Sequence, residues 1–92
     1  MAAYLVSYST ASEQIRANLD EFMAALGAVP IADCLCGLEM ELDLEAFRRW
    51  LTGQLEERDA LVVIELCPRL GQANQNLSKE AAVWLEQQLQ PR

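Results

Sequence analysis

Three groups of side chains in this sequence have types and spacings that could support chemistry. Ser9 follows a β-prone segment near the N-terminus, where small α/β sheets often place reactive groups. A serine nucleophile needs a neighbouring general base, but the chain has no histidine and its one lysine, Lys79, is remote in sequence. The sequence therefore predicts that Ser9 helps to cap a helix or a turn, and it predicts no catalytic residue.

The cysteines form the second group. Cys34-x-Cys36 and the distant Cys67 could offer thiolates to a metal, and a homodimer would pool two such sets. Structural zinc sites usually take four ligands from Cys and His, and this chain falls short of that number. Because cysteine is also among the most buried residue types, the sequence favours packing in the core or in a hairpin.

Glu39, Glu41 and Asp43 form the third group, a row of carboxylates at two-residue spacing. Residues two apart on a strand share a face and lie about 7 Å apart, which suits a divalent metal or a general acid–base pair. A solvated strand face followed by a helix cap explains the same residues. The sequence favours this second interpretation, and we expect no metal and no other cofactor.

The elements that would position these groups follow the order β-α-β-β-α-β with an additional C-terminal helix. Strands are expected at 3–8, 28–32, 35–42 and 60–67. Helices are expected from the turn at 9–12 to about 26, at 44–55, and from the cap at 78 to about 90. This order is that of the ferredoxin-like α+β arrangement, a four-stranded antiparallel sheet with two helices on one face. The 92 residues form one domain, with the β-α-β-β-α-β core in 1–67 and a connector and helix in 68–92.

Several local expectations follow from these elements. The first strand should be central, and 60–67 is apolar enough to be a central strand covered on both faces. Thr10-x-x-Glu13 fits a capping box for the first helix, and Gly27 should end that helix. Asp43 and Ser78 should cap the two later helices.

Charge and hydropathy exclude several classes of partner. Lys and Arg number 7 against 14 Asp and Glu, which gives a net charge of −7. A nucleic-acid-binding surface is normally basic, and an acidic surface also repels anionic membranes. The longest apolar run, 60–64, is too short to span a bilayer, and no signal peptide is apparent. A cytoplasmic protein with reduced thiols is the expectation.

Trp50, Trp84 and Leu85 are the candidate interface residues. Tryptophans at helical spacing suit a core, and the indole N–H also suits an interface where one side stays wet. The sequence leaves open whether the C-terminal helix, which carries Trp84 and Leu85, packs on its own domain or on a neighbouring chain.

Four short segments carry a family resemblance: AYLVSY at 3–8, AALG at 24–27, ELDL at 41–44 and RDALVVI at 58–64. Together with the Trp84-Leu85 pair, they resemble the small CRISPR adaptation endoribonuclease family, and most of all its stand-alone SinR-like relatives. The resemblance spans residues 3–89 and implies a ferredoxin-like homodimer. That family's proposed metal-binding acid follows a tyrosine at the end of the first strand, where this chain has Ser9. A serine hydroxyl cannot replace a carboxylate as a ligand for Mg²⁺, so nuclease activity is not carried over.

Three functional hypotheses follow. The leading one is a non-catalytic, homodimeric, cytoplasmic protein-interaction domain, because the chain is acidic, lacks a catalytic constellation and should leave one sheet face free for association. The first alternative is a degenerate divalent-metal-dependent nuclease that uses Glu39, Glu41 or Asp43 in place of the missing acid. The second alternative is an acidic decoy that occupies the basic groove of a nucleic-acid-binding protein.

Overall fold

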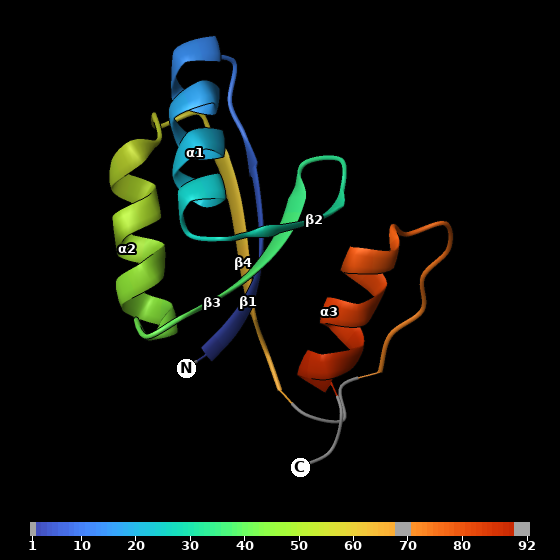
Figure 1. Cartoon of the computed structure of the whole chain (residues 1–92). Helices are drawn as coiled ribbons and strands as arrows, with labels where there is room; N and C mark the ends of the chain where they lie inside the picture. The colour runs from blue at the N-terminus through green and yellow to red at the C-terminus, as the bar shows by residue number, and fades with distance from the viewer. Residues whose placement is uncertain (1, 68–70, 90–92) are drawn as a thin grey trace.

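The computed structural model describes residues 2–67 and 71–89, which form a four-stranded antiparallel sheet with helices on both faces (Figure 1). The strands are β1 (Ala2–Ser9), β2 (Val29–Ala32), β3 (Leu35–Met40) and β4 (Ala60–Leu66). The helices are α1 (Glu13–Ala25), α2 (Leu44–Gln54) and α3 (Lys79–Leu89). The α+β class and the antiparallel sheet are thereby confirmed. The residues 68–70 of the expected connector and the expected helix end at Gln90 lie outside the described residues.

The strand order is β2-β3-β1-β4, with every neighbouring pair antiparallel. β1 is central, as predicted, and its Val6 lies opposite Cys36 of β3 and Val63 of β4. The prediction that β4 is central and covered on both faces was wrong, because β4 is an edge strand. Val62 and Ile64 are 54% and 48% exposed. Apolar composition alone does not distinguish burial on two faces from burial on one.

Helices α1 and α2 cover the first face of the sheet, where the larger core lies. Its fully or nearly buried members are Tyr4, Val6, Leu19, Met23, Leu38, Phe47 and Leu51. The Tyr4 ring is inaccessible to solvent, packs against Phe47 with ring centroids 5.1 Å apart, and donates from its hydroxyl to the carbonyl oxygen of Leu42 at 2.7 Å. Because a buried hydroxyl is costly without a partner, this bond ties β1 to the segment that leads into α2.

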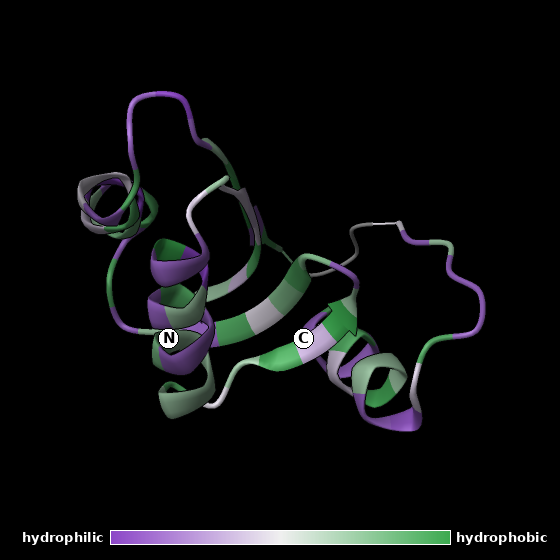
Figure 2. Ribbon diagram, turned by 90° about the horizontal axis from the view of Figure 1, so that it is seen from above, coloured by the Kyte–Doolittle hydropathy of each residue, from purple (hydrophilic) through white to green (hydrophobic). Residues whose placement is uncertain are grey.

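Helix α3 covers the second face, so the C-terminal helix packs on its own domain (Figure 2). The second core contains Ala3, Ile31, Leu66, Ala81, Leu85 and Leu89. Trp84 lies directly over Gly37 of β3, where a side chain would collide with the indole ring. The side-chain amide of Gln88 also donates to Glu39 at 2.7 Å, across from α3 to the sheet. α3 leaves the Val62–Ile64 part of this face exposed.

The helix ends agree with the sequence at three positions and differ at one. Gly27 has a φ of +78°, the left-handed conformation expected after α1. Asp43 accepts from the Ala46 N–H at 2.8 Å, and Ser78 accepts from the Ala81 N–H at 3.1 Å. The predicted Thr10 cap was wrong, because Ser12 caps α1 by accepting from the Ile15 N–H.

Thr10 has a different role in the turn before α1. Its Oγ1 accepts from the Ser12 N–H at 3.1 Å, and its side chain is buried. Thr10 therefore orients the capping residue rather than capping the helix itself. Within the described residues, none of the helices has the length and apolar character needed to cross a bilayer.

Gly37→Ala tests the contact that seats α3 on the sheet. An alanine Cβ would lie 2.5 Å from Cη2 and 2.9 Å from Cε3 of the Trp84 ring, so the indole ring, or α3 with it, must shift. We expect the free energy of unfolding to fall by about 1–3 kcal/mol, as overpacking typically costs, measured by urea denaturation.

Gly53→Ala is the matched control. Gly53 lies in α2 with open space around it, so alanine should raise the free energy of unfolding by about 0.5–1 kcal/mol through its helix propensity. Equal effects of the two substitutions would show that the Trp84–Gly37 contact does not hold α3 in place.

Candidate functional site

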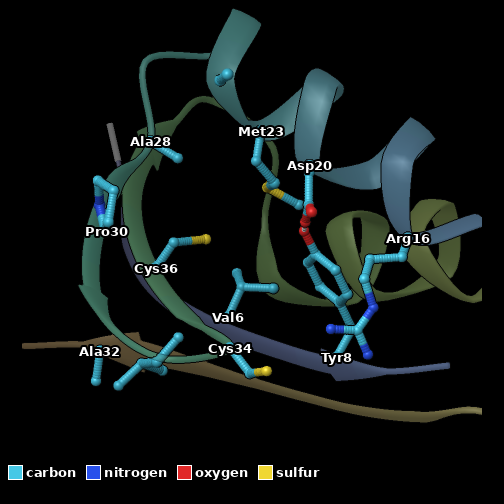
Figure 3. A pocket seen from close by; sticks show the side chains of 12 residues that line it. Val6, Tyr8, Arg16, Asp20, Met23, Ala28, Pro30, Ala32, Cys34 and Cys36 are labelled. Carbon is cyan, nitrogen blue, oxygen red and sulfur yellow. Dashed lines mark hydrogen bonds between the residues drawn. The ribbon is translucent and has the colours of Figure 1, made fainter. Parts of the chain in front are cut away.

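A cavity of about 300 Å³ lies between α1 and the β2–β3 hairpin, on the first face of the sheet (Figure 3). Its polar and reactive groups are Tyr8, Arg16, Asp20, Cys34 and Cys36. The rest of its wall comes from Val6, Met23, Ala24, Ala28, Pro30, Ala32 and Leu35. An apolar hollow on which a few titratable groups converge is the usual form of a small binding site.

Tyr8 and Asp20 form a bonded pair at one end of this cavity. The Tyr8 hydroxyl donates to Oδ1 of Asp20, and Figure 3 shows the two side chains meeting between β1 and α1. Burial, the hydrogen bond and the charge of Asp20 raise the pKa of Tyr8 well above its usual value of 10.0, against a smaller opposing effect of Arg16. Tyr8 is therefore a neutral hydrogen-bond donor at pH 7 and does not act as a base.

Arg16 supplies the positive charge of the cavity. It lies one turn before Asp20 on α1, and its Nη2 donates to the carbonyl oxygen of Thr10 at 3.4 Å. The cavity therefore combines one guanidinium with one carboxylate, and the carboxylate is already engaged by Tyr8.

The structure brings two of the three cysteines to this cavity. Cys36 lies on β3, is half-buried, and points into the space beneath Met23, whereas Cys34 is exposed in the hairpin turn (Figure 3). Burial, and secondarily the charge of Asp20, raises the pKa of the Cys36 thiol. Cys67 is exposed beyond the end of β4 and does not line the cavity.

The backbone at Cys34 is unusual for this residue type. Its φ is +59°, in the left-handed region that glycine, asparagine and aspartate populate far more readily than other residues. The turn is short, because Ala32 of β2 pairs directly with Leu35 of β3. The cost of a left-handed non-glycine residue is about 1–2 kcal/mol, which the strand pairing on both sides must offset.

The three carboxylates of the expected row are separated. β3 ends at Met40 rather than at Leu42, so Glu41 lies in the bend after the strand. Glu39 is on the second face, where it accepts from Gln88, while Asp43 caps α2. The described residues contain no group of three or more His, Cys, Asp or Glu side chains placed to hold a metal.

Ser9 is the last residue of β1, exposed and opposite Ala60 of β4. The expected contribution of Ser9 to the helix cap is made instead by Ser12 and Thr10. The polar contact at this end of β1 is made by the preceding residue, Tyr8, whose hydroxyl donates to Asp20. Tyr8 was not among the candidate residues predicted from the sequence.

The three candidate interface residues have separate environments. Trp50 of α2 stacks on Phe22 of α1, with ring centroids 4.2 Å apart, and is partly buried. Trp84 is partly buried over Gly37, and Leu85 is 6% exposed in the second core. In this chain, these side chains hold helices together or hold α3 on the sheet.

No known family model matches this chain. A comparison with curated proteins also finds no significant match. The resemblance to the CRISPR adaptation endoribonucleases stays a prediction, and the site has to be interpreted from its own geometry.

The Tyr8–Asp20 pair was not predicted from the sequence, although two features of the sequence indicate it. Tyr8 shares its strand face with the buried residues Tyr4 and Val6, and Asp20 lies one residue from the buried Leu19 on α1. A polar side chain beside a core stripe often has a partner on the facing element. That partner could not be assigned without knowing where α1 crosses β1.

Tyr8→Phe tests this pair through the pH dependence of stability. The folded pKa of Tyr8 lies above its unfolded value near 10, so the stabilisation is fully present below pH 10 and is lost as the pH rises further. We expect the free energy of unfolding, measured by urea denaturation between pH 7 and 11, to fall less steeply above pH 10 in Tyr8→Phe than in the wild type.

At pH 7 the same substitution should cost at most about 1 kcal/mol, because the bond is partly exposed to solvent. Asp20→Asn is the matched control, since an amide keeps the acceptor but removes the charge. Superposable pH profiles of wild type and Tyr8→Phe would contradict the pair.

Proposed function

We propose that this chain is a non-catalytic protein-interaction domain that forms a homodimer through the free edge of β4. The observation that carries the proposal is an edge strand without the features that normally prevent association. β4 pairs with β1 on one side and with no other strand of the described residues. Its outer backbone N–H and C=O groups are therefore available to a further strand.

The two edges of the sheet differ in this respect. β2, the other edge, has only four residues and carries an exposed proline, Pro30, and both features discourage strand addition. β4 has seven residues, no proline, and Glu65 as its single charged side chain. The contrast favours β4 as the site of association.

On the second face of the sheet, the exposed side chains Val62 and Ile64 of β4 are apolar. Val62 lies opposite Ser7 and Ile64 opposite Leu5 in β1, so both face the side that α3 covers in part. Leu66, at the end nearest α3, is 8% exposed, whereas Ile64 and Val62 are about half exposed. Burial of this apolar strip would add to the main-chain hydrogen bonds of a new strand pair.

A second copy of the chain would be complementary to this edge. Antiparallel pairing of two β4 strands about a two-fold axis at Val63 places Val62 opposite the partner's Ile64 and Leu61 opposite the partner's Glu65. Like charges do not meet, and each apolar residue of the strip finds an apolar neighbour. The interface is self-complementary, as two-fold symmetry requires.

The remaining parts of the proposal rest on the sequence and on the topology. The strand order β2-β3-β1-β4, with α1 and α2 on one face, supports a ferredoxin-like fold. The resemblance to the SinR-like proteins would also imply a dimer. The free cysteines support a cytoplasmic location. The separated carboxylates Glu39, Glu41 and Asp43 give the nuclease alternative no support.

Val62→Lys tests the dimer. A charged side chain in the centre of the apolar strip should convert a dimer at micromolar concentration into a monomer, measured by size-exclusion chromatography with light scattering. Val83→Lys is the matched control, because Val83 is 43% exposed on α3 and lies away from the β4 edge. A wild-type monomer, or a dimer that survives Val62→Lys, would rule out this interface.

The salt dependence separates this proposal from the acidic-decoy alternative. Two chains of net charge −7 repel each other, so salt should strengthen the homodimer by screening that repulsion. A decoy bound to a basic partner should instead be weakened by salt.

A further inference from the structure

We propose that the cavity between α1 and the β2–β3 hairpin binds Cu(I) through the thiolates of Cys34 and Cys36 and the thioether of Met23. All three sulfur-bearing side chains line this one cavity, two from the hairpin and one from α1 (Figure 3). The described residues contain no group of three or more His, Cys, Asp or Glu side chains that could hold a metal. The proposed site differs from such a group because its third ligand is the thioether of a methionine.

The donor set decides the class of metal. Thiolate and thioether sulfur are soft ligands that favour Cu(I), whereas Mg²⁺ and Ca²⁺ require oxygen. Structural zinc takes four ligands, and this cavity does not offer four free ones. Asp20 is engaged by the Tyr8 hydroxyl, and Cys67 lies outside the cavity. Cu(I) is satisfied by fewer ligands, so the cavity fits Cu(I) better than zinc.

The hairpin holds the two thiols on the same side. Cys36 is fixed by the pairing of β3 with Val6 of β1 and Pro30 of β2. Cys34 lies two residues earlier in the turn and is exposed, so its side chain has room to turn toward an ion bound beside Cys36. The left-handed backbone at Cys34 would suit asparagine or glycine better, and a role for its thiol gives a reason for cysteine at this position.

Arg16 offsets part of the negative charge that a bound ion would leave in the cavity. Two thiolates and one Cu(I) leave a single negative charge, the Asp20 carboxylate adds a second, and Arg16 provides one positive charge on the same wall. Each thiol releases its proton when the metal binds, so the apparent affinity should rise with pH. Met23 is 3% exposed and packs in the first core, which keeps its thioether shielded from water.

Competition with the chromogenic Cu(I) chelator bicinchoninate tests the proposal on the fully reduced wild-type chain, under anaerobic conditions with ascorbate. We expect one equivalent of Cu(I) to move from the chelator to the protein. Cys34→Asn, which suits the left-handed turn, and Cys36→Ala should each weaken binding by more than the about 10–100-fold that loss of a supporting residue typically causes.

Cys67→Ser is the matched control, because it removes an exposed thiol outside the cavity. It should retain wild-type affinity and stoichiometry, and far-UV circular dichroism checks that each variant is folded. Failure of the wild type to compete with the chelator, or equal losses in Cys67→Ser and the two cavity variants, would overturn the site. Tighter binding of Zn²⁺ than of Cu(I) would overturn the choice of metal, and full affinity in Met23→Leu would remove the thioether from the ligand set.

Discussion

The burial of Tyr4 in the central strand is the constraint on which the rest of this structure depends. Its ring packs against Phe47 of α2, and its buried hydroxyl donates to the Leu42 carbonyl. That bond fixes where the chain leaves β3 and therefore where Asp43 can cap α2. Leu61 and Val63 of β4 pack against the same core that Tyr4 and Phe47 share.

The sheet separates the two proposed functions in space. The sulfur-lined cavity lies on the first face, over β2 and β3, whereas the exposed strip of Val62 and Ile64 lies on the second face at the opposite edge. A partner strand on β4 would therefore leave the cavity open. Because the domain is small, its one sheet packs against helices on both faces and also carries both proposed binding surfaces.

Local chemistry could be predicted from the sequence where it depends on near neighbours. The caps at Asp43 and Ser78 and the glycine after α1 need only residues a few positions apart, and each was predicted correctly. Thr10 was mistaken for the cap because Thr10 and Ser12 both offer a hydroxyl, and the choice depends on where β1 ends.

Features that depend on distant parts of the chain could not be predicted in the same way. An apolar run such as Leu61–Ile64 indicates a strand, but its place at the sheet edge is set by which strands pair with β1. The cavity likewise requires α1 to cross above the β2–β3 hairpin, which brings Asp20 to Tyr8 and Met23 over Cys36. The two cysteines of the hairpin were recognised from their spacing, but their common wall with Met23 depends on that crossing.

The two tryptophans lie on helices that cover opposite faces of the sheet. Their fluorescence can therefore report on the two helical layers separately. Trp50 stacks on Phe22 within the α1–α2 layer, while Trp84 rests on Gly37 beneath α3. Replacing either indole with phenylalanine would leave a fluorescence signal that reports on one layer alone. Release of α3 could then be observed separately from the unfolding of the sheet and its first two helices, in a chain whose far-ultraviolet spectrum would merge the two events.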